Sequence, residues 1–213
     1  MAESAEPRRS VGRLLWTPIG LLVLALAVMW GIEIVDTLVL DDRLQGNGIL
    51  PRRRDGLDGI VWTPFLHSDF GHVASNSLPL LALGGLVAVR GMRYWALVTL
   101  TVIVVGGGLT WALAGFGNHI GASGVVFGYF GAILAAAFFE RRPRALASAL
   151  LVIVFYGGMV AGIVPQEYIS WEGHLFGMGA GVIAARAMAE PRRQRATAPD
   201  NPEPWELDEP WLN

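Results

Sequence analysis

Residues 118–139 read NHIGASGVVFGYFGAILAAAFF, a stretch without a single charged side chain. About 20 apolar residues suffice to cross a bilayer as a helix, so we predict a membrane span over about 122–139. Ser123 lies at the start of this span, flanked by Gly121 and Gly124. Small residues then recur at every fourth position, which lets a second helix approach closely; they are Gly124, Gly128, Ala132 and Ala136.

The rest of the chain has the composition of a membrane protein. Of its 213 residues, 53% are hydrophobic and 16% are charged, whereas about 25% of the residues in a soluble domain are charged. The first apolar block is longer than the core of a signal peptide and lacks a small-residue cleavage site, so we predict that it is a span. The sequence therefore predicts an all-α polytopic membrane protein with six spans, the other five covering about 16–40, 72–89, 94–114, 145–164 and 172–189.

The arginines predict the orientation of these spans. Cytoplasmic segments of membrane proteins carry an excess of basic residues, and every basic residue of this chain is Arg. With both termini in the cytoplasm, the outer side holds only Arg43 and the run 52–54, and the inner side holds Arg8, Arg9, Arg13, Arg90, Arg93, Arg141, Arg142, Arg144, Arg192, Arg193 and Arg195. We predict a cytoplasmic tail over 1–13, a six-span domain over 14–190 and a disordered cytoplasmic tail, rich in Pro, Asp and Glu, over 191–213.

Polar side chains gather at the starts of the second, fourth and sixth spans. They occur in HSDFGHVASN (67–76), NHIGASG (118–124) and WEGH (171–174). In the predicted topology all three segments lie on the outer side, so they converge at one depth just below the outer membrane surface. Polar groups are costly in hydrocarbon and usually face a protein interior or a water-filled cavity, where they have a function.

Ser123 and His174 have the chemistry of a nucleophile and its base. A serine hydroxyl needs a base to take its proton, histidine titrates near neutral pH, and the free N–H groups at a helix start favour a developing anion. Gly177 and Gly181 follow His174 on one side of its helix, and packing them on the small residues of the fourth span brings His174 to Ser123. The alternatives are a serine N-cap and an interfacial histidine bonded to a carbonyl.

His72 and Asn76 are four residues apart and project from one helix face. Both side chains can donate to a carbonyl oxygen that becomes negative, so we predict that they stabilise an oxyanion. The His-Glu-x-x-His pattern of zinc proteases is absent, and the chain has no cysteine, which excludes disulfides, thiolate ligands and a cysteine nucleophile. We therefore expect no metal and no cofactor; the alternative is a site built from His67, His72, His119 and His174.

These residues resemble the motifs of the rhomboid family of intramembrane serine proteases. The family has a Gly-x-Ser-Gly motif, a histidine in a glycine-spaced last core helix, and a His-x4-His-x3-Asn signature in its second span. The matching residues are Gly121, Ala122, Ser123 and Gly124, then His174, Gly177 and Gly181, then His67, His72 and Asn76. The resemblance covers roughly residues 15–190, on spans two, four and six in the family's order.

The resemblance implies a six-helix rhomboid-like bundle in a bacterial plasma membrane, with Ser123 and His174 as a catalytic dyad without a third acid. It implies an oxyanion hole formed by His72, Asn76 and backbone N–H groups near Ser123. The expected reaction is cleavage of transmembrane-helix substrates near the outer membrane face through an acyl-enzyme. The expected partners are transmembrane protein substrates and the lipid bilayer, with no nucleic acid, and no oligomeric state follows from the sequence.

The sequence departs from the family at two points. Phe127 stands where many members have a tyrosine packed against the catalytic histidine, so stacking is expected without the hydroxyl. The loop at 41–71 lacks the Trp-Arg pair of some members. The rival functions are a catalytically silent rhomboid-like protein that binds membrane clients and a small transporter or channel, although the repeated halves of many transporters are not evident. Glycines and a proline within 157–165 allow a gate, with ordinary packing as the alternative.

Overall fold

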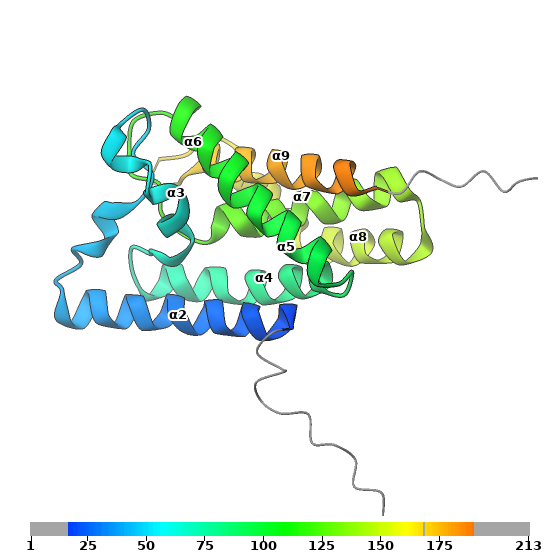
Figure 1. The fold of residues 1–213 in the computed structure, drawn as a ribbon, viewed down its shortest axis with the longest axis horizontal. Helices are drawn as coiled ribbons and strands as arrows, with labels where there is room; N and C mark the ends of the chain where they lie inside the picture. Colours follow the sequence, from blue (N-terminus) through cyan, green and yellow to red (C-terminus); the bar gives the residue numbers. More distant parts are fainter. Residues whose placement is uncertain (1–16, 168, 190–213) are drawn as a thin grey trace, which may run out of the picture.

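The computed structural model describes residues 17–167 and 169–189, so both predicted tails lie outside the described residues. The long helices pack side by side as a bundle (Figure 1), which confirms the predicted fold class. Their bounds are α2 (Pro18–Val39), α4 (Phe70–Ala88), α5 (Met92–Thr101), α6 (Gly107–Leu113), α7 (Ser123–Glu140), α8 (Pro143–Tyr156) and α9 (Trp171–Met188).

Five stretches of the described chain are long and apolar enough to cross a membrane: Pro18–Val39, Phe70–Ala88, Met92–Leu113, Ser123–Glu140 and Pro143–Ile163. They correspond to the first five predicted spans, with only small differences at their ends. The sixth predicted span corresponds to α9, which is less apolar because it contains Glu172, His174, Arg186 and several glycines. The count of six spans therefore stays a prediction.

The small differences arise because caps, rather than hydropathy, decide where a helix begins. The Asp69 carboxylate accepts a hydrogen bond from the backbone N–H of His72 at 2.8 Å and starts α4 before the predicted block. That bond is the main reason why the pKa of Asp69 lies below its usual range. At the start of α2 the Thr17 hydroxyl oxygen accepts from Gly20 N at 3.0 Å in the same way.

Helix α7 lies at the centre of the bundle, since 67% of its span is buried against 11% of the span that contains α8. It packs most extensively against α9, and their backbones meet at glycines. A Cβ atom placed on Gly177 would collide with the carbonyl oxygen of Gly124, and one on Gly181 with that of Gly128. The predicted close approach of the two glycine-bearing faces is therefore confirmed.

The third apolar stretch is not a regular α-helix. A π-helical turn, η4 (Val102–Gly106), joins α5 to α6. The Val102 side chain fills the space beside Gly128, where a Cβ atom would collide with it. Such turns are rare in proteins, and those that occur are often at functional sites. This one carries no sequence signal, because its residues are as apolar as those around it.

The loop between α2 and α4 is tied to the loop that precedes Ser123. Its regular parts are η1 (Leu44–Asn47), η2 (Arg54–Gly56), α3 (Gly59–Trp62) and η3 (Thr63–Phe65). Ile49 and His119 form an isolated β-bridge with two backbone hydrogen bonds of 3.0 Å. The Thr63 hydroxyl donates to the carbonyl oxygen of His119 at 2.9 Å. These bonds fix the position of the loop relative to the start of α7.

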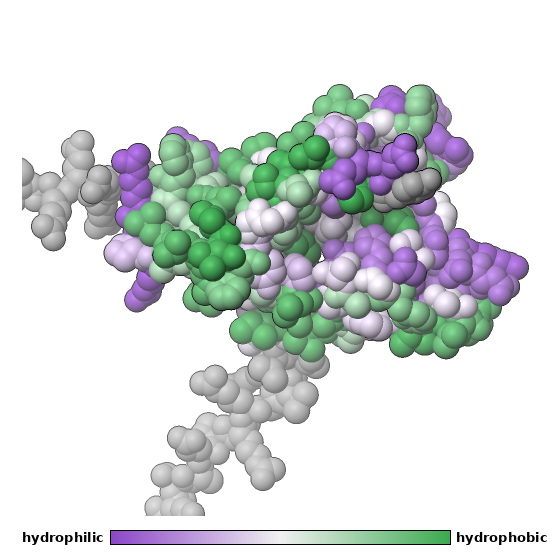
Figure 2. Space-filling view, turned by 180° about the vertical axis from the view of Figure 1, so that it is seen from behind, coloured by the Kyte–Doolittle hydropathy of each residue, from purple (hydrophilic) through white to green (hydrophobic). Residues whose placement is uncertain are grey.

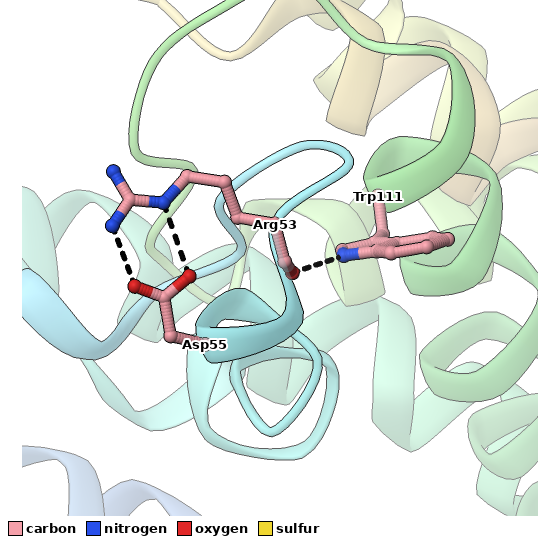
Figure 3. A network of polar contacts seen from close by, with 3 residues as sticks. All are labelled: Arg53, Asp55 and Trp111. Carbon is pink, nitrogen blue, oxygen red and sulfur yellow. Dashed lines mark hydrogen bonds and ion pairs between the residues drawn. The ribbon is translucent and has the colours of Figure 1, made fainter.

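Contacts of Arg52 and Arg53 hold the tip of the same loop against α6 and the residue that follows it. Trp111 of α6 donates its indole N–H to the carbonyl oxygen of Arg53 at 2.8 Å, while the Arg53 side chain pairs with Asp55 (Figure 3). That pairing lowers the pKa of Asp55 and raises that of Arg53. Arg52 donates to the carbonyl oxygen of Ala114 at 2.6 Å. Loop and helix are thus joined although the Trp-Arg pair of some family members is absent.

The surface has the character of a lipid-facing protein. On the face shown in Figure 2, hydrophilic residues gather towards the two ends of the molecule, with hydrophobic residues between them. Helix α8 is the clearest case, because large apolar side chains point outward along it: Leu146, Leu150, Leu151, Ile153, Val154 and Phe155. Exposed apolar area of this extent is rare on soluble monomers and is expected where the surroundings are lipid.

Candidate active site

Ser123 is the first residue of α7 and follows a turn that requires glycine. Gly121 has a φ of +109°, in the region that L side chains rarely adopt. Its N–H donates to the carbonyl oxygen of Thr63 at 3.0 Å, which anchors the turn to η3. The Ser123 hydroxyl therefore lies at a helix start, where backbone N–H groups have no intrahelical acceptor.

His174 of α9 is in direct contact with Ser123. Its Nε2 atom lies 2.8 Å from the Ser123 hydroxyl oxygen, and its Nδ1 atom lies 2.8 Å from the carbonyl oxygen of Gly162. A carbonyl can only accept, so Nδ1 carries the proton and Nε2 presents a lone pair to the hydroxyl. The carbonyl of Gly162 thus orients the imidazole, and the contact expected between α7 and α9 is present.

Phe127 covers one face of the imidazole, and Gly162 lies at its Nδ1 edge. The Phe127 ring stacks on His174 with the ring centres 4.2 Å apart and the planes 8° from parallel, which confirms the stacking expected from the sequence. A Cβ atom on Gly162 would lie 2.9 Å from the Phe127 ring and 3.2 Å from Nδ1 of His174. Gly162 lies in η5 (Gly157–Ile163), the 3₁₀ continuation of α8. The part of the chain considered as a gate therefore also orients His174.

His72 and Asn76 lie beside the turn that precedes Ser123. A Cβ atom on Gly121 would lie 2.7 Å from Nε2 of His72 and 3.6 Å from Nδ2 of Asn76. His72 Nδ1 accepts from the N–H of Ser68 at 3.4 Å, which leaves the ring proton on Nε2, facing the turn. The Asn76 amide nitrogen is buried and has no partner among the described residues. Two potential donors therefore lie beside Gly121, two residues before Ser123.

His67 supports the turn that precedes Ser123. Its Nε2 atom accepts from the N–H of Ala122 at 3.4 Å, and its ring lies edge-on to that of His72. Burial, with a smaller contribution from His72, lowers the pKa of His67 to about 4. The ring is therefore neutral at physiological pH, which fits an acceptor at Nε2. Its place in the structure is that of a supporting residue.

A small cavity of about 40 Å³ reaches Ser123 and His174 from the side of α6. That volume is enough for water, which needs roughly 10–15 Å³ per molecule on this scale. Its polar lining includes Thr110, His119 and Ser170, while Ile49 and Ile60 contribute apolar walls. The cavity offers a place for the water that a hydrolysis requires.

His119 and Ser170 form a second histidine–serine contact in this cavity. The Nδ1 atom of His119 lies 2.6 Å from the Ser170 hydroxyl oxygen, and its buried Nε2 has no partner in the described part of the chain. The sequence marked His119 only as a possible metal ligand and did not mark Ser170. No group of three His, Cys, Asp or Glu within residues 17–167 and 169–189 is placed to hold a metal ion.

The fold and the site together define a helical integral membrane protein with a half-buried serine–histidine pair at the start of its central helix. The model of the rhomboid domain matches residues 56–191 of the chain. The chain is 35% identical to an uncharacterized protein of Mycobacterium tuberculosis, covering 79% of this chain and 74% of that one. It is also 35% identical to an uncharacterized protein of Mycobacterium leprae, covering 85% and 76%. The chain belongs to the rhomboid family.

Proposed function

We propose that the chain is an intramembrane serine endopeptidase with Ser123 as nucleophile and His174 as general base. One observation carries the proposal: Nε2 of His174 lies 2.8 Å from the Ser123 hydroxyl while Nδ1 is bound to the carbonyl of Gly162. This arrangement leaves the imidazole in the tautomer that accepts the serine proton. A silent client-binding protein has no need of that orientation.

The proposed reaction is an acyl transfer followed by hydrolysis. His174 takes the hydroxyl proton as the Ser123 oxygen attacks the substrate carbonyl carbon, and the carbonyl oxygen becomes negative. His72, Asn76 and backbone N–H groups at the start of α7 donate to this oxygen. The protonated imidazole gives its proton to the leaving amine, and water then attacks the acyl-enzyme with His174 again as base.

The substrate class follows from where this site lies. The Ser123–His174 pair is enclosed by helices whose outer surfaces are apolar, so a peptide reaches it most directly from within the bilayer. Residues in a helix have their carbonyls engaged, so the scissile segment has to unwind. We propose transmembrane-helix substrates, cut near the outer face of a bacterial plasma membrane, with both termini of this chain in the cytoplasm.

Cleavage of a single-span model substrate by the purified full-length chain in detergent tests the proposal. Ser123→Ala and His174→Ala are expected to leave the substrate uncut, whereas the wild type cuts it. Ser77→Ala is the matched control, since it removes a hydroxyl that contacts Trp30 and the carbonyl of Val73 rather than the site. Equal cleavage by Ser123→Ala and the wild type would refute the mechanism.

A further inference from the structure

A second, larger cavity lies at the end of the bundle opposite to Ser123. Its volume is about 780 Å³, within the range of about 300–1,000 Å³ that is usual for ligand sites. It is lined where α4 and α7 end, where α5 and α8 begin, and by Met188 at the end of α9. We call it the arginine-end cavity. None of its lining residues belongs to the proposed protease site.

The lining of this cavity is positively charged. Arg90, Arg142 and Arg144 line it, and Glu140 is the one acidic residue among its described lining residues. Glu140 already forms an ion pair with Arg90, and its side chain is only 6% exposed. The Arg90 guanidinium also lies over the ring of Tyr94, 4.2 Å from its centre. The described lining residues thus carry three guanidinium groups and one carboxylate, a net charge of +2.

The start of α8 adds a second attraction for an anion. Pro143 is the first residue of this 14-residue helix, and within the described part of the chain the N-cap residue makes no capping hydrogen bond with its side chain. Uncapped N–H groups and the positive end of the helix dipole together favour phosphate groups. Arg144 and Ala145, whose N–H groups belong to this first turn, both line the cavity, as does Ser148. Charge and backbone donors therefore favour the same kind of ligand.

The remaining walls are apolar and continue onto the outer surface of the bundle. Leu86, Val87 and Ile133 line the interior of the cavity. Val89, which lines the cavity, is 81% exposed, and Leu151, which follows Ser148 by three residues on the same side of α8, is 45% exposed. A small anion such as free phosphate makes no use of such walls. A ligand with an anionic head and hydrocarbon tails contacts both parts.

We propose that the arginine-end cavity binds an anionic phospholipid, with its phosphate between the start of α8 and the arginines and its acyl chains along the apolar rim. Basic pockets between membrane helices are suited to anionic lipid headgroups. The cavity lies at the level where the helices end, which is the level of the headgroups in a bilayer. This binding is independent of the proposed protease activity.

Lipid titration of the full-length chain in neutral detergent, with bound lipid counted by native mass spectrometry, tests the proposal. Phosphatidylglycerol is expected to bind more tightly than phosphatidylcholine, and inorganic phosphate is expected not to displace it. In the double variant Arg142→Gln/Arg144→Gln the affinity for phosphatidylglycerol is expected to fall roughly 30-fold, since each basic residue contributes about fivefold near an anionic headgroup. Ser148→Phe, which places a bulky ring in the cavity wall and keeps every arginine, is expected to weaken binding as well.

The matched control is Arg93→Gln/Arg141→Gln, which removes the same charge from the same end of the bundle. Neither residue lines the cavity, so this variant is expected to bind phosphatidylglycerol within about threefold of the wild type. Equal affinity for the two lipids, an equal loss in the control, or unchanged binding by Arg142→Gln/Arg144→Gln would overturn the proposal. Displacement by inorganic phosphate at similar concentrations would assign the cavity to a free anion instead.

Discussion

Replacement of Gly181 by alanine tests whether the contact between α7 and α9 positions the site. Gly181 lies two helical turns beyond His174, and a Cβ atom there would collide with the backbone carbonyl of Gly128. Because the obstacle is backbone, it can be relieved only by separating the two helices, by more than about 1 Å to reach ordinary contact. Overpacking of this kind costs about 1–3 kcal/mol.

The same shift acts on the hydrogen bond between His174 and Ser123, which is 2.8 Å long. A misplacement of about 1 Å at a reacting group lowers the rate on the order of 100-fold. Gly181→Ala is therefore expected to lower both the unfolding temperature and the initial rate of cleavage of a transmembrane substrate, measured in the same detergent. The two losses have one cause.

Gly179→Ala is the matched control on the same helix. A Cβ atom at Gly179 meets nothing within 4 Å, and alanine is favoured over glycine within a helix by about 0.5–1 kcal/mol. This variant is expected to unfold at the same or a higher temperature and to cleave at the wild-type rate. If Gly181→Ala unfolds and cleaves like Gly179→Ala, the glycine contact does not position the dyad.

Three further predictions concern other parts of the molecule. Asn76→Ala is expected to lower kcat about 100- to 1,000-fold with little change in KM, because it removes one oxyanion donor; an unchanged kcat in steady-state assays would exclude that role. The pKa of His67 is about 4 in the fold and about 6.5 when unfolded. As the pH falls, the unfolded state therefore binds the proton first, and the free energy of unfolding falls by roughly 3 kcal/mol from pH 6.5 to pH 4. Thermal unfolding across this range should show a weaker pH dependence in His67→Gln than in the wild type, and an identical dependence would contradict the assignment. The chain has no cysteine, so a membrane-impermeant thiol reagent applied to intact cells is expected to label Phe116→Cys, whose native side chain is 96% exposed, and not Arg93→Cys; the reverse pattern would invert the topology.

The sequence predicts the helices and the central contact of the fold because both are written in local patterns. Apolar length marks the spans, and the spacing of Gly177 and Gly181 indicates the side of α9 that meets α7. The positive φ of Gly121 places it in a turn, which agrees with its position just before a helix. The stacking of Phe127 on His174 was expected from the resemblance to the rhomboid family rather than from a local pattern.

Other features depend on contacts between distant segments and leave no local signal. The carbonyl of Gly162 orients His174, but every residue has a carbonyl, so its choice depends on how η5 packs. The bridge between Ile49 and His119 is likewise a backbone contact between two loops. The ion pair of Arg90 with Glu140 joins the ends of α4 and α7, and hydropathy alone marks both residues only as the limits of a span.

The most direct measurement asks whether His174 makes the Ser123 hydroxyl a nucleophile. The full-length protein in detergent is treated with a fluorophosphonate, which forms a covalent adduct only with an activated serine, and the adduct is located by peptide mass spectrometry. We predict one adduct, on Ser123, that is absent from Ser123→Ala and strongly reduced in His174→Ala while Ser77→Ala reacts normally. No adduct on Ser123 in the folded wild-type protein, or undiminished labelling in His174→Ala, would contradict the proposed dyad.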